Sequence, residues 1–470
     1  MKQLRILFGV VLVLSMVLAA CAPQTIIETV EVEKVVEVEK EVVVEKEVEV
    51  EVEVEKVVEV TAAPDAPKMF DGREINFMAG QPHQVAGRQL AEWFTEETGA
   101  RVNVLVVPYP NMIEKATMDV TSGAGVYDVI QYWYPGLGSL VDNGVLADIS
   151  PWWDENADAF EVDDIIPAFL DNYTLYDGAR YGIPYDGDIH LMFYNTTIMD
   201  KYGAEPPTTW DEYLETCKTI TEGEGDSGTY GCGIMATKFP LILIGTFLNR
   251  SAGFGGAFLD ADGNPVINSP ENVAALEHLI AELPFAIPDP KAVGFDEMLG
   301  PWLTGRVAMV EFWTDLGQMT DNPEQSTIIG EWGVAPMPIQ GEKGVVAAPM
   351  NAGWGVGLST MTKDEEVSKA FLAFIMRPET NIRINTLVGG LDPMRVSTFA
   401  DPEFRAHVTD ELADAALAAE LSNAVAWPHD AEWWDMQEVL NENLALALNG
   451  DLTAQQALDD TQAAWEAILQ

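Results

Sequence analysis

The chain has 470 residues, of which 76 are acidic and 25 are basic, giving a formal net charge of −51. A chain of this length exceeds what one hydrophobic core organises, so two globular units with additional segments are expected. The negative charge repels phosphate backbones and anionic lipid headgroups, so no nucleic-acid partner is expected. Strong acidity relates mainly to solubility and identifies no ligand by itself.

The first twenty residues have the pattern of an export signal. Lys2 and Arg5 precede an apolar run that is too short to be read as a membrane span. Leu18-Ala19-Ala20-Cys21 resembles a bacterial lipobox. That resemblance implies that residues 1–20 are removed and that Cys21 becomes the lipidated first residue. An ordinary signal peptide with an incidental cysteine is the alternative.

A low-complexity segment at residues 28–60 repeats Val and Glu with occasional Lys. It contains no Gly, Pro or aromatic residue, so it lacks the means to turn or to build a core. The alternation favours a strand, whereas the spacing of Glu and Lys favours a solvated helix or coiled coil, and its conformation stays open. We expect residues 21–68 to be a lipid-anchored acidic spacer.

From residue 69 onwards, predicted strands alternate with predicted helices. Their periodicity predicts strands at 74–79, 101–107 and 127–130, and helices at 84–97 and 112–121. This alternation is typical of a mostly parallel sheet, in which ligands lie at the carboxyl ends of the strands.

The loops expected at those strand ends are rich in aromatic and amide side chains. They contain Gln81 and His83, then Tyr109, then a run from Gln131 to Tyr134. Aromatic rings stack on the C–H faces of sugars while amides and carboxylates bind the hydroxyls, so this composition favours a carbohydrate site. Because large aromatics are usually well buried, roughly half of the rings in the 131–134 run are expected to belong to the core.

A second group of candidate side chains follows in the middle of the chain. Tyr185-Asp186-Gly187-Asp188 places two carboxylates before a predicted strand at 189–194. They could serve a glycosidase, ligate Ca²⁺ or accept hydrogen bonds from hydroxyls. Hydroxyl binding is favoured, because glycosidase carboxylates flank the scissile bond rather than share a loop. Thr209 with Glu212 predicts a helix start with a capping box.

Four motifs, in this order along the chain, resemble the family 1 extracellular solute-binding proteins of ABC importers, the group that includes maltose-binding protein. They are Tyr181-Gly182-Ile183-Pro184 with Pro206-Pro207-x-x-Trp210-Asp211-Glu212, then Gly305-Arg306-Val307-Ala308-Met309, then the stretch 332–338, then Gly353-Trp354-Gly355. The resemblance covers residues 69–470. It implies an α/β, two-lobed, type II periplasmic-binding-protein-like fold, with a mostly parallel sheet flanked by helices in each lobe and hinge strands between them. The expected N-terminal lobe comprises 69–184 and 341–380, and the C-terminal lobe 185–340 and 381–470.

The same resemblance implies a binding protein rather than an enzyme, with no cofactor and no metal. It implies a monomer outside the cytoplasm that delivers a carbohydrate from the interlobe cleft to ABC permease subunits, and the lipobox implies that this monomer is lipid-anchored. Trp433 and Trp434 lie on different faces of a helix, so at most one of them stacks on sugar. The residues expected to contact the ligand are Gln81, His83, Gln131, Tyr132, Trp133, Tyr185, Asp186, Asp188, Trp313, Asp315, Trp354 and Trp433.

Other interpretations remain open at this point. A secreted glycoside hydrolase would take its acid pair from Asp186, Asp188, Glu311 and Asp315, and an adhesin or sensor lipoprotein would use the spacer as a stalk. The ligand could also be a polyamine or a polyol, since rings and carboxylates together bind cations. Cys217 and Cys232 could form a disulfide, but sequence cannot show that they approach.

Overall fold

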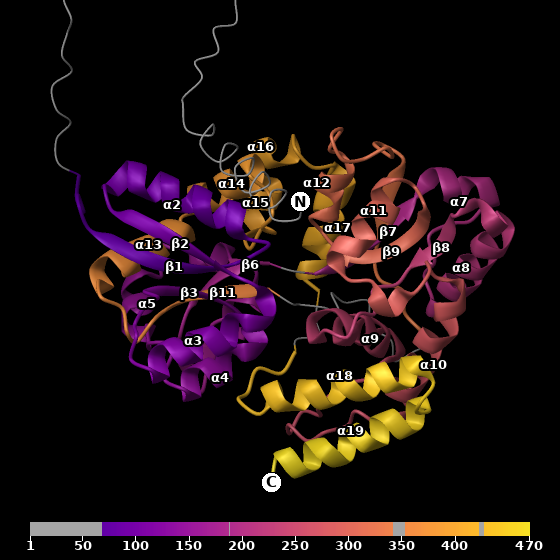
Figure 1. Cartoon of the computed structure of the whole chain (residues 1–470). Coiled ribbons are helices and arrows are strands. Elements are labelled where there is room, and N and C mark those ends of the chain that lie inside the picture. Colours follow the sequence, from indigo (N-terminus) through magenta and orange to yellow (C-terminus); the bar gives the residue numbers. More distant parts are fainter. Residues whose placement is uncertain (1–67, 188, 342–352, 423–426) are drawn as a thin grey trace, which may run out of the picture. The chain divides into compact units, whose positions relative to one another are not determined.

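The computed structural model of the chain describes residues 68–187, 189–341, 353–422 and 427–470 (Figure 1). Cys21, the spacer at 28–60 and Asp188 lie outside these residues. The described residues belong to one compact unit. None of its helices is both long and apolar enough to cross a membrane.

The first of two main sheets has five strands. Their order is β2 (Arg101–Val107), β1 (Glu74–Gly80), β3 (Val129–Trp133), β11 (Trp354–Leu358) and β6 (Ile183–Asp186). Strand β1 pairs in parallel with β2 and β3, whereas β11 is antiparallel to both β3 and β6. The helices that contact this sheet include α2 (Gln84–Thr98), α3 (Met112–Thr121) and α13 (Glu365–Met376).

The second main sheet has four strands and its own helices (Figure 1). Their order is β10 (Trp332–Ala335), β7 (His190–Asn195), β9 (Val307–Trp313) and β8 (Tyr230–Gly233). Strand β7 is antiparallel to both β10 and β9, and β8 is parallel to β9. The helices of this half include α7 (Thr196–Tyr202), α8 (Trp210–Glu224), α9 (Pro240–Phe254), α10 (Pro270–Glu282), α11 (Phe295–Leu303) and α12 (Leu316–Thr320).

Each sheet is mostly parallel, as expected, with one reversed strand: β11 runs against the other four strands of the first sheet, and β7 runs against the other three strands of the second. The chain leaves the first sheet through β6 and enters the second through β7; it leaves the second through β10 and returns through β11. A strand that leaves a sheet and a strand that enters it point in opposite directions, so β6 pairs antiparallel with β11 and β7 with β10.

Short sequence patterns predicted the bounds of several strands and helices correctly. The strand predicted at 101–107 and the helix predicted at 112–121 are confirmed as β2 and α3. Thr209 and Glu212 form the predicted capping box of α8. The strand predicted at 127–130 is wrong in its bounds: β3 spans Val129–Trp133, so Gln131 to Trp133 belong to the strand and not to a loop.

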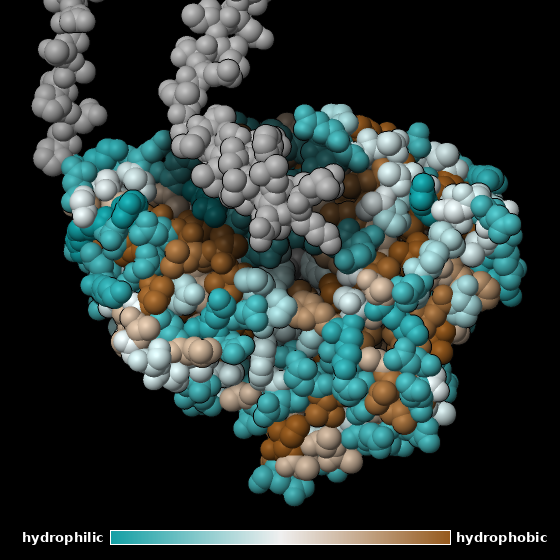
Figure 2. Space-filling model, viewed as in Figure 1, coloured by the Kyte–Doolittle hydropathy of each residue, from teal (hydrophilic) through white to brown (hydrophobic). Residues whose placement is uncertain are grey.

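The C-terminal part of the chain is helical. Helix α14 (Pro378–Leu387) contacts α2 and α13, and the lobe boundary expected at residue 380 falls inside it. Helix α17 (Asp410–Glu420) contacts β7 and β10 of the second sheet. Helix α18 (Trp433–Asn449) packs on α9, and α19 (Ala454–Ile468) packs on α18 and α10. Hydrophilic residues cover most of the face shown in Figure 2, with hydrophobic residues in separate patches.

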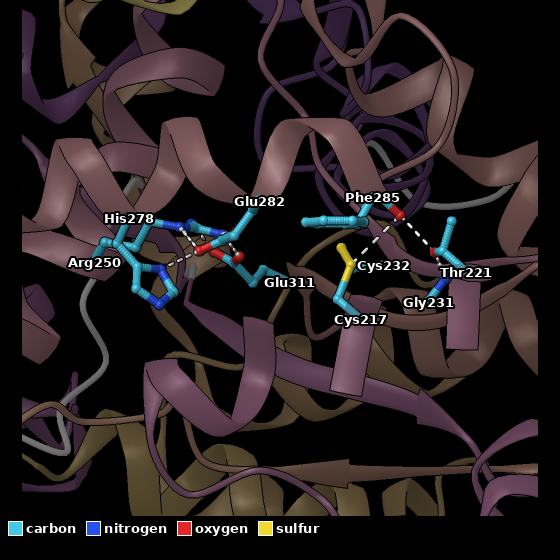
Figure 3. Close-up of a disulfide and its surroundings, with 9 residues drawn as sticks. All are labelled: Cys217, Thr221, Gly231, Cys232, Arg250, His278, Glu282, Phe285 and Glu311. Carbon is cyan, nitrogen blue, oxygen red and sulfur yellow. Dashed lines mark hydrogen bonds and ion pairs between the residues drawn. A yellow bond between two sulfur atoms is a disulfide. The ribbon is translucent and has the colours of Figure 1, made fainter. Parts of the chain in front are cut away.

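A buried ion network organises the core of the second half (Figure 3). Arg250 of α9, itself fully buried, donates to Glu282 of α10 at 2.9 Å and to Glu311 of β9 at 2.6 Å. His278 contacts Glu282 at 2.6 Å, and the guanidinium lies 4.4 Å from the centre of the Trp210 ring. Burial alone would raise the pKa of Glu282, but Arg250 and then His278 outweigh it and lower that pKa. The network thus ties two helices to the sheet.

A disulfide joins Cys217 on α8 to Cys232 on β8, with the two Cα atoms 5.2 Å apart (Figure 3). Beside it, the Thr221 hydroxyl donates to the Phe285 carbonyl at 2.6 Å and accepts from the Gly231 N–H at 2.8 Å. Strand β8 is the outer strand of its sheet. The disulfide therefore attaches an edge strand to the helix that covers it.

Replacing Cys217 and Cys232 together by Ala should lower the free energy of unfolding by about 3 kcal/mol, because the bridge closes a loop of 15 residues in the unfolded chain. Denaturant titration of the purified protein measures this loss. Reductant should destabilise the wild type and leave the variant unchanged. Equal denaturation midpoints for the variant and the oxidised wild type would show that the bridge does not stabilise the fold.

Candidate functional site

A pocket of about 250 Å³ lies where aromatic side chains from both halves of the chain meet. Its polar lining comes partly from α18 and from the start of α9. The Trp354 and Tyr109 rings are stacked, with centroids 4.5 Å apart and planes 17° apart. The aromatic residues that line the pocket are Tyr109, Trp133, Phe239, Trp354 and Trp434.

Several polar atoms of the pocket lining are buried without a partner. They are Nε1 of Trp133, both amide atoms of Gln437 and Oδ1 of Asn441, none of which has a hydrogen-bond partner among the described residues. Buried polar atoms in native proteins are nearly always paired, so unpaired atoms in a pocket indicate positions for water or for a ligand. Stacked rings with free amide groups suit a ligand that has apolar faces and hydroxyls.

Behind the stacked pair, His83 takes part in a buried hydrogen-bond chain. The Gln131 carbonyl oxygen accepts from the Gly80 N–H at 2.8 Å, so its NH₂ group must face His83 Nδ1, with which it is hydrogen-bonded. An amide nitrogen only donates, so Nδ1 accepts and the ring proton resides on Nε2. Nε2 lies 3.0 Å from Asp186 Oδ2. Gln131 therefore determines which way the His83 ring presents its proton.

Asp186 ends β6 at the crossover to the second sheet. Its Oδ1 accepts from the Asp392 N–H at 2.6 Å, and its side chain is buried. In the strand register it lies opposite Trp354. The adjacent Tyr185 is 1% exposed, and its hydroxyl has no hydrogen-bond partner among the residues that the structure describes. Burial, followed by the Asp186 charge, raises the Tyr185 pKa.

The end of β9 supplies the candidates of the second half. Trp313 is buried against His190, with centroids 4.4 Å apart, and against Phe295 at 5.5 Å. It does not line the pocket. Asp315 lies two residues further on, and its buried Oδ1 has no hydrogen-bond partner in the described part of the chain. Burial, followed by the charge of Asp186, raises the pKa of Asp315 to about 7.

Three other expected ligand contacts lie away from the pocket. Tyr132 is fully buried, and its hydroxyl donates to the Tyr173 carbonyl at 2.8 Å. Gln81 is exposed; its backbone N–H donates to the Val107 carbonyl, and its carbonyl accepts from the Gln84 N–H. Trp433 is fully buried against Trp427, while its neighbour Trp434 lines the pocket. Of the twelve expected residues, Trp133 and Trp354 line the pocket directly.

The glycines on either side of Trp354 leave room for buried core side chains. A Cβ at Gly355 would lie 2.5 Å from the Tyr132 ring, and one at Gly353 would lie 2.1 Å from the Tyr173 hydroxyl. Substitution at either position would displace a buried tyrosine. The close approach that glycine permits here is therefore between β11 and two aromatic rings beneath it.

Several site residues were not among the expected set. Trp434 lines the pocket in place of the expected Trp433, because the sequence does not show which helix face turns inward. Glu420 does not line the pocket, but with Leu412 and Ala416 it recurs every four residues along the buried face of α17. An acidic residue at such a position is buried by its helix and is a candidate for function.

The chain matches the family model described as bacterial extracellular solute-binding protein over residues 81–382. A probable amino-acid ABC transporter periplasmic-binding protein of Sinorhizobium fredii is 26% identical to it over 417 residues, which cover 87% of this chain and 92% of that protein. An arabinooligosaccharide-binding protein of Halalkalibacterium halodurans is 26% identical over 343 residues, 70% of this chain and 72% of that protein.

Solved structures share the fold over their whole length. A solute-binding protein from Agrobacterium radiobacter in complex with ribitol has a TM-score of 0.75 and 23% identity, covering 85% of this chain and 100% of that one. Maltose-bound MalE3 of T. maritima has a TM-score of 0.72 and 22% identity; the match covers 84% of this chain and 99% of that one. The expected two-lobed binding-protein fold is confirmed by these structures.

The raised pKa of Asp315 predicts how stability depends on pH. An unfolded Asp titrates near pH 3.9, whereas Asp315 in the folded protein titrates near pH 7. Between these values the folded state holds a proton that the unfolded state has lost, so stability falls as pH rises, by at most about 1.4 kcal/mol per pH unit. The Asp315→Asn variant should therefore have the same melting temperature as the wild type at pH 4 and a higher one at pH 8. Melting curves that stay a constant distance apart from pH 4 to 8 would contradict this.

Proposed function

Because this chain belongs to the bacterial extracellular solute-binding protein family, we propose that it is the substrate-binding subunit of an ABC importer and that it binds a small sugar, oligosaccharide or polyol in the aromatic pocket. The family consists of binding proteins, which agrees with the expectation that the chain is not an enzyme and leaves the glycoside hydrolase interpretation without support. Permease subunits are the proposed membrane partner, and the proposed working form is a monomer.

The composition of the pocket is the main support for a sugar or polyol ligand. It combines five aromatic rings with buried amide and indole groups that lack partners. Rings bury the C–H faces of a sugar or polyol, and unpaired polar atoms gain hydrogen bonds from its hydroxyls. The volume of about 250 Å³ is at the small end of ligand sites, which favours a polyol or a small sugar over a long oligosaccharide.

The related proteins are consistent with this class without deciding it. The name of the Halalkalibacterium protein refers to arabinooligosaccharides, and the Agrobacterium structure contains ribitol. The name of the Sinorhizobium protein refers to amino acids instead. An α-carboxylate needs a cation, and Lys238, the basic residue of the pocket lining, is bonded to Glu442. We therefore place sugars and polyols before amino acids.

We also propose that the lobes comprise 69–184 with 341–380 and 185–340 with 381–470, and that they close on the ligand. A ligand that contacts both halves favours the closed form by its additional contacts there. Pocket residues from the first sheet and from α9 and α18 support such two-sided contact. The permease would then recognise the closed form.

Trp354→Ala should abolish the rise in melting temperature that a bound sugar or polyol produces, because the stacking face is removed. The rise is measured on the full-length protein against a panel of monosaccharides, disaccharides, polyols, polyamines and amino acids, since a ligand that binds only the folded state raises it. Trp434→Ala should weaken the response by about tenfold in Kd, or about 1.4 kcal/mol.

The matched control for these substitutions is Trp152→Ala. Trp152 is half-buried on α5 (Ser150–Asn156), packs on Phe160 and does not line the pocket. Its loss should lower the melting temperature but leave the ligand-induced rise intact. If the Trp354 variant responds like the wild type, the pocket is not the binding site; a response to amino acids alone would refute the ligand class.

We propose further that Cys21 is lipidated and that residues 21–68 hold the binding unit away from the membrane. Cys21→Ser in the full-length chain, expressed in a bacterium, should move the protein from the membrane fraction to the aqueous fraction, because acyl chains supply the membrane affinity. Mass spectrometry of the mature N-terminus is the direct measurement. Recovery of the wild type without lipid would favour an ordinary signal peptide.

A further inference from the structure

Helix α18 contributes two amide side chains to the wall of the pocket. Gln437 and Asn441 are four residues apart, so they lie on the same face of the helix, one turn after the other. Both line the pocket, and they are 0% and 2% exposed. Amide side chains are mostly exposed in folded proteins, and buried ones are hydrogen-bonded. This face of α18 therefore needs polar partners.

The structure does not supply those partners from the residues that it describes. Neither amide atom of Gln437 has a hydrogen-bond partner among them, and the same holds for Oδ1 of Asn441. Nε1 of Trp133, which lines the pocket from β3, is also buried and unpaired in this part of the chain. Three such side chains around one cavity indicate that the occupant of the cavity completes their hydrogen bonds.

Helix α18 is fixed by its neighbour α19, so the two amides have a defined position. The Trp465 indole donates to the Met436 carbonyl at 2.7 Å, and the Asn443 amide donates to the Thr461 hydroxyl at 2.9 Å. A side chain on a fixed helix is held more precisely than one on a loop. The position of Gln437 therefore suits a residue that distinguishes one ligand from another.

The unpaired atoms of the lining include donors and acceptors in equal number. Among the described residues, the Gln437 NH₂ group and the Trp133 indole N–H are the donors, and the Gln437 and Asn441 carbonyl oxygens are the acceptors. A hydroxyl both donates and accepts, whereas a carboxylate only accepts and an ammonium only donates. A set of hydroxyls therefore matches these atoms, and a single ionic group would leave half of them unpaired.

The charges of the pocket lining do not favour an ionic ligand either. Glu438 and Lys238 line the pocket, but both are exposed, and Lys238 is bonded to Glu442. The buried side chains of the lining are aromatic, aliphatic or amide groups, all of them neutral. Such a surface does not compensate for the lost hydration of a charge. The pocket is thus built for a neutral solute.

We propose that the solute bound by this protein is uncharged and carries two adjacent hydroxyls that bind the amide of Gln437. One hydroxyl donates to the Gln437 carbonyl oxygen and its neighbour accepts from the NH₂ group, while Asn441 accepts from a further hydroxyl. This inference rests on the proposed function, because it specifies the ligand of the same pocket. Gln437 then determines specificity, since a solute that lacks either hydroxyl leaves a buried amide atom unpaired.

Deoxy analogues of neutral solutes test this proposal. Full-length protein is titrated calorimetrically with D-glucose, D-ribose, sorbitol and ribitol, and with their 2-deoxy and 3-deoxy counterparts. For the solute that binds most tightly, loss of one hydroxyl of an adjacent pair should weaken binding about tenfold or more, or about 1.4 kcal/mol. The charged analogues D-gluconate and D-glucosamine should bind about tenfold more weakly than D-glucose, or weaker still.

Gln437→Met keeps the length of the side chain and removes both polar atoms. It should weaken binding of the same solute about tenfold or more, and the deoxy analogue should then bind as well as its parent, because the amide that distinguishes them is absent. Without ligand, its melting temperature should equal or exceed that of the wild type, since a buried unpaired amide is removed. Loss of stability in the unliganded variant would instead indicate a structural glutamine.

Asn441→Ala and Asn443→Ala form a matched pair on the same helix. Asn443 is bonded to Thr461 and does not line the pocket. Asn441→Ala should weaken binding about threefold or more, because one hydrogen bond to the solute is lost. Asn443→Ala should lower the melting temperature and leave the affinity unchanged. Equal losses of affinity in the two variants would contradict the role of Asn441.

The outcomes separate this inference from the proposed function. If Trp354→Ala abolishes binding while Gln437→Met binds parent and deoxy solutes as the wild type does, the role of Gln437 is refuted and the proposed function stands. Tighter binding of gluconate or glucosamine than of glucose would refute the uncharged ligand. Binding of none of the neutral solutes would count against both the inference and the proposed function.

Discussion

The contact on which the site depends is that of the Asp186 carboxylate with the Asp392 N–H and with His83 Nε2, at 2.6 and 3.0 Å. Asp186 stands at the point where the chain leaves the first sheet, and Asp392 approaches from a loop more than two hundred residues later. The contact is buried, so these three groups are held without competition from water. Gln131 then orients His83, and His83 lies edge-on to Trp354.

The second half contributes a rigid frame rather than many of the pocket's rings. Arg250, Glu282 and Glu311 are buried together and connect α9, α10 and β9. Such a group is costly to desolvate, and it persists because each charge is paired in good geometry. Because α9 begins at the pocket with Phe239 and Pro240, a fixed α9 also fixes that wall.

The kinds of residue at the site were easier to predict than the residues themselves. Trp313 and Trp354 both lie at strand ends beside glycines or acidic residues, yet Phe295 and His190 bury Trp313 while Trp354 lines the pocket. A tryptophan suits a core and a sugar site equally well, so local composition does not separate these fates. Asp188 lies outside the described residues, and its part in ligand binding stays a prediction.

By itself, the sequence determined the family, the alternation of strands and helices, and the helix starts. These rest on short-range rules: the hydroxyl of Thr209 caps a helix three residues away, and apolar periodicity marks β2 and α3. The tertiary structure decided which strand of each sheet is reversed, the choice of Trp434 over Trp433, and the meeting of Asp186 with Asp392. Those features depend on strand direction across crossovers and on contacts between distant segments, which no local pattern encodes.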